Sequence, residues 1–241
     1  MGQDAAVATL LHLSDTHLGA TPGGPVMACD PDARLATVLA AWTARGESAD
    51  LVVHSGDVTD DEHPDAVRRV DEALATLGAP VLAVGGNHDA PTVALGGPDT
   101  AEVGAWRVLG ARTARPGQIH GTLDVPALLH RLDALDDRPT VLVVHHPPRS
   151  RSTHEWFQLD GADALLDALA ARPHVRAVLS GHLHDAFALP GPGDLVLLGG
   201  PSTAQAIAHE GEAMRFGEGL TGARVVRLHD DGRLEHELLE A

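Results

Sequence analysis

The chain has 241 residues, 44% of them hydrophobic, which is enough for the core of one large α/β domain or two small ones. Its 34 acidic residues outnumber its 17 basic ones, all Arg, and the resulting formal charge of −17 disfavours binding to long nucleic acids and anionic membranes. The single cysteine, Cys29, excludes an intrachain disulfide, and no apolar run reaches the roughly 20 residues of a membrane span, so we expect a cytoplasmic protein.

The first half of the chain alternates β-like runs with helical patterns. Asp30 and Pro31 are suited to begin the first helix, as cap and first helical residue. In chain order, the predicted elements are a strand at 6–13, a helix at 31–45, a strand at 51–53, a helix at 64–77, a strand at 81–84, and Gly- and Pro-rich loops at 91–121 with a short strand near 106–109.

The second half continues the alternation and ends in strands. Its predicted elements are a helix at 126–135, a strand at 141–144, a surface loop over the site at 150–161, a helix at 162–171, and strands at 175–179, 195–198, 223–228 and 234–238. Asp230-Asp231-Gly232 would join the last two strands as a hairpin. With no repeat or linker, the alternation predicts a single α/β domain over residues 1–241.

Short polar blocks follow five of the β-like runs, and each offers oxygen or imidazole ligands. They are Asp15-Thr16-His17, Gly56-Asp57, Gly86-Asn87-His88-Asp89, His145-His146-Pro147 and Gly181-His182-Leu183-His184. Any one of them alone is typical of a turn or a cap. Ligand sites of α/β sheets cluster at the carboxyl ends of strands, so blocks far apart in sequence are expected to meet.

The blocks supply donors for a pair of metal ions. If the backbone stays extended, Asp15 and His17 point to one side, as do His182 and His184. The fourth block offers His145 or His146, which spacing does not separate. We expect one ion at Asp15, His17, Asp57 and His184, and a second at Asp57, Asn87, His182 and either His145 or His146. Without a thiolate, divalent or mixed-valence manganese, iron, zinc or cobalt all suit such a site.

Two ions about 3.5–4 Å apart ionise a bridging water at neutral pH, and the hydroxide attacks phosphorus in line. His88 follows a ligand and is expected to donate a hydrogen bond to the phosphoryl oxygen or a proton to the leaving alkoxide. Asp60 or Asp89 would orient an imidazole. The candidate substrate contacts are Asn87, His88, His146, Arg149 and His154. Trp156 and Phe157 are suited to stack on a nucleobase, although aromatic residues that open a helix usually pack beneath it.

The order of the blocks resembles the calcineurin-like metallophosphoesterase superfamily. The His145–Pro148 block, residues 117–132 and the tail at 219–238 resemble its class III cyclic-nucleotide phosphodiesterase and glycerophosphodiesterase branch. The resemblance implies a four-layer α/β/β/α sandwich with the dinuclear site at one edge, and it selects His145 over His146 as the ligand. It also implies an enzyme that hydrolyses a small phosphodiester, either a 3′,5′-cyclic nucleotide or a glycerophosphodiester.

The chain departs from that branch near the expected substrate pocket. Residues 149–154 are more basic than expected, and the chain looks too short for a large cap. An open site, or one completed by a second copy in a homodimer, is therefore expected. The alternatives are a phosphomonoesterase acting on a small metabolite, a nuclease, which the acidic charge disfavours, and a non-catalytic scaffold, which would have lost ligands or His88.

Overall fold

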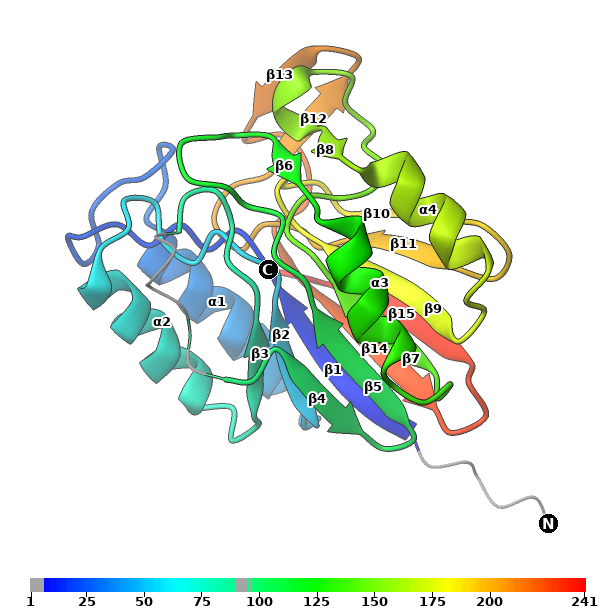
Figure 1. The fold of residues 1–241 in the computed structure, drawn as a ribbon. Coiled ribbons are helices and arrows are strands. Elements are labelled where there is room, and N and C mark those ends of the chain that lie inside the picture. Colours follow the sequence, from blue (N-terminus) through cyan, green and yellow to red (C-terminus); the bar gives the residue numbers. More distant parts are fainter. Residues whose placement is uncertain (1–6, 90–94, 96) are drawn as a thin grey trace.

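The computed structural model describes residues 7–89, 95 and 97–241, and two sheets form its centre (Figure 1). The first sheet has the order β15-β14-β1-β2-β3, and the second has the order β10-β11-β9-β7-β5-β4. Strands β1, β2 and β3 run parallel, as do β5, β7, β9 and β11. Antiparallel strands complete both sheets, namely β14 and β15 in the first and β10 and β4 in the second.

The elements follow the predicted order closely. The first sheet consists of β1 (Val7–Leu13), β2 (Leu51–His54), β3 (Val81–Ala83), β14 (Gly222–His229) and β15 (Leu234–Glu240). The second consists of β4 (Thr100–Val103), β5 (Trp106–Gly110), β7 (Thr140–Val143), β9 (Val175–Ser180), β10 (Phe187–Pro190) and β11 (Val196–Gly199). The helices are α1 (Pro31–Ala44), α2 (Pro64–Ala75), α3 (Val125–Asp133), α4 (Ala162–Ala170) and the short 3₁₀ turn η1 (Glu155–Phe157).

Alternating apolar side chains hold the layers together. Leu10 of β1 and Val53 of β2 belong to the core between the two sheets. Their neighbours Leu11 and Val52, which pair across the ladder, belong instead to the core beneath α1 and α2. A third core lies between the second sheet and α3 and α4. Because successive residues of a strand face opposite sides, these cores give the layers helix, sheet, sheet, helix (Figure 1).

The structure confirms the four-layer sandwich and the C-terminal hairpin, in which β14 pairs with β15 around the Asp230–Gly232 turn. Strands that the sequence did not predict are the edge strands β4 and β10 and two small ladders. One ladder joins β6 (Gly121–Thr122) to β8 (Leu159–Asp160), and the other joins β12 (Ile207–Glu210) to β13 (Ala213–Phe216). The predicted loops at 91–94 and 96 lie outside the described residues. None of the helices in the described part is long and apolar enough to cross a membrane.

Candidate metal centre

The polar blocks meet at one edge of the two sheets, after the carboxyl ends of β1, β2, β3, β7 and β9. The loops after β1 and β2 run together, since the amide of Asp15 donates to the carbonyl of Gly56 at 3.0 Å and that of His17 to the carbonyl of Asp57 at 3.0 Å. The amide of Gly181 donates to the carbonyl of His145 at 3.0 Å, which joins the loops after β7 and β9. The backbone thus brings the blocks together.

Left-handed backbone conformations are concentrated in the expected ligands. The φ angles are 53° at Asp15, 49° at His17, 52° at Asp57, 69° at His182 and 52° at His184. Non-glycine residues seldom adopt this region, and such conformations cluster at functional sites. The expected extended backbone at Asp15–His17 and His182–His184 was therefore wrong, because β1 ends at Leu13 and β9 at Ser180. The side chains still converge, through turns rather than through strand alternation.

One group of donors lies between the loops after β1, β2 and β9. Its members are buried and offer atoms within 4.8 Å of one another: Asp15, His17, Asp57 and His184. His17 donates through Nδ1 to the carboxylate of Asp60 at 3.2 Å, and His184 through Nδ1 to the carbonyl of Gln205 at 2.8 Å. Their Nε2 atoms therefore face each other, 3.0 Å apart, and, although burial opposes the charged form, the nearby carboxylates raise the pKa of His17. Two facing imidazole nitrogens beside two carboxylates share either a proton or a metal ion, so the group can hold a cation.

A second group of electron-rich atoms surrounds His145. Its Nδ1 donates to the carbonyl of Ser55 at 2.8 Å, so its Nε2 is the nitrogen that faces the site. That Nε2 faces Asn87 Oδ1 at 3.1 Å and Asp57 Oδ2 at 3.3 Å. The same Asp57 oxygen lies 3.5 Å from His17 Nε2 in the first group. Asp57 thus stands between the two groups, with one carboxylate oxygen near an imidazole of each.

The loop after β9 adds His182 to the second group. Its Nε2 donates to the carbonyl of Trp156 at 2.8 Å, which leaves Nδ1 as the atom with a free lone pair. Each of the four expected imidazole ligands therefore has its other nitrogen held by a carbonyl or a carboxylate. Metal-binding histidines characteristically use this arrangement, which fixes both the tautomer and the ring orientation.

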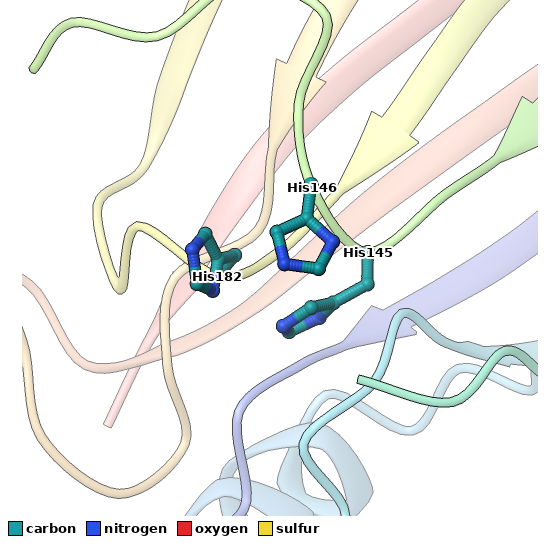
Figure 2. A group of neighbouring side chains, drawn as sticks. All are labelled: His145, His146 and His182. Carbon is teal, nitrogen blue, oxygen red and sulfur yellow. The ribbon is translucent and has the colours of Figure 1, made fainter. Parts of the chain in front are cut away.

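Figure 2 shows the imidazoles of His145, His146 and His182 gathered near one another, and these three also offer nitrogens within 4.8 Å. The hydrogen bonds separate His146 from its neighbour. Its Nε2 donates to the carbonyl of Ile119 at 2.9 Å and its Nδ1 accepts from Thr113 Oγ1 at 2.8 Å. Both ring nitrogens of His146 are thus occupied by protein partners, whereas His145 keeps one free. The geometry favours His145 as the ligand.

The electrostatics also fit a cation. Burial alone would raise the pKa of Asp57, but the imidazoles of His145 and His17 hold it well below its usual range. Burial opposes a charged His145, yet the Asp57 carboxylate raises the pKa of this imidazole to about 9. Burial lowers the pKa of His184 to about 4, so that ring is neutral. Since imidazole binds a metal in its neutral form, His145 must give up its proton when a cation occupies the site.

His88 lies beside both groups. Its amide donates to Asp57 Oδ1 at 2.9 Å, and its Nδ1 donates to the carbonyl of Asp60 at 3.1 Å. The ring stands edge-on to His17, with centroids 4.7 Å apart, and it lines a pocket at the site. Asp60 orients an imidazole, as hypothesised. Asp89 has another role, because its carboxylate accepts hydrogen bonds from backbone amides of the loops after β2 and β3.

A pocket of about 160 Å³ opens onto the site, and its polar lining comes from expected ligands and His88. The rest of its lining is apolar: Met27, Ile119, Trp156, Phe157, Ile207, Met214 and Phe216. Most of these residues carry no motif that marks them in the sequence. Ile207, Met214 and Phe216 lie on the β12–β13 hairpin. The sequence does contain a signal for this hairpin, because the two residues Gly211-Glu212 separate two short β-like runs.

Three of the expected substrate contacts do not line this pocket. Arg149 donates to the carbonyl of Pro190 at 2.7 Å and lines a separate cavity. The Nδ1 of His154 accepts from the amide of Trp156 at 3.2 Å and so caps η1. His146 is buried behind the site. Asn87 and His88 do line the pocket.

Comparison with known proteins agrees with this geometry. The calcineurin-like phosphoesterase family matches residues 8–186. The 3′,5′-cyclic adenosine monophosphate phosphodiesterase CpdA of Pseudomonas aeruginosa is 34% identical over 245 aligned residues, which cover 96% of this chain and 89% of that protein. A probable cyclic nucleotide phosphodiesterase of Synechococcus is 32% identical, covering 83% and 82% of the two chains.

Among solved structures, a dimetal phosphatase from Danio rerio has the same fold. Its TM-score is 0.62 at 15% identity, over 97% of this chain and 98% of that one. The family match, the relatives and the converging donors lead to one conclusion. The chain belongs to the calcineurin-like phosphoesterase family and is a metal-dependent phosphoric ester hydrolase.

Proposed function

We propose that this chain is a dinuclear-metal phosphodiesterase that hydrolyses 3′,5′-cyclic nucleotides. The relatives named as cyclic nucleotide phosphodiesterases support the substrate class, since the first of them aligns with nearly the whole chain. The donor geometry supports two ions, one at Asp15, His17, Asp57 and His184 and one at Asp57, Asn87, His145 and His182.

The observation that carries the proposal is the position of Asp57. One of its carboxylate oxygens lies 3.5 Å from His17 Nε2 and 3.3 Å from His145 Nε2, and those two imidazoles belong to different donor groups. A carboxylate can bind two cations with its two oxygens. A site for a single ion would not require a carboxylate such as that of Asp57 between two separate groups of imidazoles, whereas a site for two ions does.

Two ions held here would supply a water that is ionised at neutral pH and would neutralise charge on the phosphoryl group. The residues of the chain do the rest. The amide oxygen of Asn87 and the ring of His88 line the pocket where the phosphoryl group would lie. With Nδ1–H bound to the Asp60 carbonyl, the doubly protonated ring of His88 would donate its Nε2 proton to the departing alkoxide.

Replacement of the shared carboxylate tests the dinuclear arrangement. Asp57→Ala should abolish turnover and reduce bound metal to less than one ion per chain, because both donor groups lose a ligand. Asp137→Ala removes a carboxylate that is 96% exposed and serves as the matched control. Metal content by mass spectrometry and hydrolysis of cAMP should both remain at wild-type values in the control. Full activity of Asp57→Ala would show that the ligand set is wrong.

A substrate panel tests the proposed specificity. Purified protein loaded with manganese, iron, zinc or cobalt is incubated with cAMP, cGMP, a glycerophosphodiester and a small phosphomonoester. The proposal predicts the highest kcat/KM for the cyclic nucleotides. Faster hydrolysis of the monoester would assign the site to a phosphomonoesterase, and faster hydrolysis of the glycerophosphodiester would assign it to the other phosphodiester class.

A further inference from the structure

Large exposed hydrophobic side chains gather at the mouth of the active-site pocket. Of the five such residues in the described part of the chain, three line this pocket: Ile119, Trp156 and Phe216, with exposed fractions of 44%, 41% and 57%. Single exposed apolar residues are ordinary, but a group beside a polar site indicates a surface that covers a ligand. We call these three residues the apolar wall.

Hydrogen bonds hold the segments that carry Trp156 and Phe216 in place. The amide of Thr153 and the hydroxyl of Ser152 donate to the carbonyl of Gly211, at 3.0 and 3.2 Å, and so tie the segment before η1 to the β12–β13 hairpin. The amide of Ile207 donates to the carbonyl of His184 at 3.1 Å, which anchors the hairpin to the metal centre. The wall is therefore formed before any ligand enters.

Aromatic packing beneath the wall strengthens this anchoring. The ring of Phe157 lies 5.2 Å from that of His182 and 4.7 Å from that of His209, which is on β12. His209 in turn donates to the carbonyl of Leu183 at 2.8 Å. Phe157 thus packs below, while its neighbour Trp156 stays at the surface with its carbonyl bonded to His182. The Trp156 side chain is placed beside a proposed metal ligand.

The wall carries no charged side chain, and its one polar side-chain atom is the indole nitrogen of Trp156. Among the other described residues that line the pocket, every polar one is a proposed ligand or His88, and none is an arginine. An uncharged, flat group that presents its faces to these side chains therefore fits the wall best. The phosphoryl group is left to the metal centre, at the other side of the same pocket.

We propose that the apolar wall is the nucleobase subsite of this enzyme, and that Trp156 and Phe216 determine specificity by stacking on the base. This inference rests on the proposed cyclic-nucleotide activity. Stacking on an aromatic side chain tolerates any base, because every base has a π-face. Apolar pockets discriminate between similar groups by factors of about 10 to 200, far less than sites built to hydrogen-bond a substrate. The enzyme should therefore accept cAMP and cGMP with kcat/KM values within about 100-fold of each other.

A substrate without a base isolates the contribution of the wall. Trp156→Ala and Phe216→Ala should each raise KM for cAMP and cGMP by about 5- to 100-fold. Neither should change KM for ribose 3′,5′-cyclic phosphate or the metal content. Trp156→Phe should restore most of the affinity. Leu238→Ala truncates a side chain of similar exposure, 37%, on β15 and should leave all three substrates unaffected.

The outcomes separate the subsite from the activity on which it rests. A wild-type enzyme that cleaves none of these cyclic phosphates but cleaves another phosphodiester would overturn the proposed function, and the subsite with it. A wild-type enzyme active on cAMP, with unchanged KM in both alanine variants, would overturn the subsite alone. Equal KM increases on the substrate without a base would also overturn it, because the wall would then act only through the shape of the pocket.

Fluorescence gives a second measurement that does not depend on turnover. The chain has three tryptophans, and Trp42 and Trp106 are buried at 2% and 0% exposure. In the slow variant His88→Ala, cAMP should quench the emission of the exposed Trp156, whereas ribose 3′,5′-cyclic phosphate should not. Adding Trp156→Phe should remove the quenching. Quenching that persists in that double variant, or equal quenching by the substrate without a base, would contradict base stacking at Trp156.

Discussion

At the scale of single residues, the site depends on side chains with restricted freedom. The expected ligands Asp15, His17, Asp57, His182 and His184 occupy left-handed backbone conformations, and the outer nitrogens of the imidazoles are held by protein acceptors. Both restrictions cost conformational freedom in folding. As a result, imidazole nitrogens and carboxylate oxygens face one another, an arrangement that a divalent cation stabilises.

Gly86 lies next to the Asp57 carboxylate, so its substitution tests whether that carboxylate is the shared ligand. A Cβ at Gly86 would overlap the carboxylate of Asp57, so Gly86→Ala must displace it. We expect metal affinity, measured by calorimetry, to fall about 10- to 100-fold. Gly85→Ala is the matched control in the same turn, because its Cβ would meet only the flexible end of Arg112, at 3.3 Å, and Asp89 Cβ at 3.9 Å. Unchanged affinity in Gly86→Ala would show that Asp57 is not the shared ligand.

The role of His88 can be separated from metal binding. His88→Ala keeps the backbone amide that binds Asp57 but removes the proton donor. We expect kcat for cAMP to fall about 10²- to 10⁴-fold with normal metal content. The loss should be smaller for a p-nitrophenyl diester, since p-nitrophenolate leaves without protonation. Metal loss in this variant would instead make His88 a ligand.

At the scale of elements, the sequence predicted the strands and helices that carry the site. A strand that is buried on both faces gives a continuous apolar run in the sequence, and the polar block after it marks the end of the strand. Such strands can therefore be recognised from the sequence alone. The ladder β12–β13 was missed, since its short strands are half exposed and Met214 and Phe216 look like scattered surface residues. The left-handed turns were missed as well, because the residue types Asp and His do not indicate the sign of the backbone angle φ.

The ligand residues could be named from the sequence because their types and order are distinctive, whereas the partners that orient them could not. Ser55, Gln205 and Trp156 orient imidazoles through backbone carbonyls, which every residue type possesses. The apolar wall was equally hidden, because Ile119 and Phe216 meet Trp156 only after folding.

The loops after β2 and β3 are joined through Asp89. Its carboxylate accepts hydrogen bonds from the amides of Val58, Thr59 and Gly86, at 3.2, 2.9 and 2.9 Å. Asp89→Ala leaves these buried donors without their acceptor, so urea unfolding of the metal-free protein should show a loss of about 3 kcal/mol. Asp89→Asn keeps one carbonyl acceptor and should lose less. Equal stability of the alanine variant and the wild type would refute this joining role.

At the scale of the whole molecule, two sheets with separate helical layers meet at an edge that is crowded with histidines. Burial of many imidazoles in one molecule makes its stability depend on pH. His12 in β1 illustrates this, because burial, followed by the charge of Arg224 and by His54, lowers its pKa to about 3. The unfolded chain binds a proton at His12 near pH 6.5, while the folded chain does not.

Stability should therefore fall as the pH drops below about 6.5, and this contribution should level off below about pH 3. His12→Gln removes one such group. In urea titrations with a chelator present, the variant should lose about 2 kcal/mol less than the wild type between pH 8 and pH 5. Identical losses in the two proteins would mean that His12 titrates normally in the folded state.

The central claim is that two cations share Asp57. Anomalous scattering from a crystal soaked in Mn²⁺ tests it most directly, because each ion appears as its own peak. The account predicts two peaks about 3.5–4 Å apart, with Asp57 between them and His145 on one. A lone peak, or a peak bound by His145, His146 and His182 with Asp57 turned away, would contradict it.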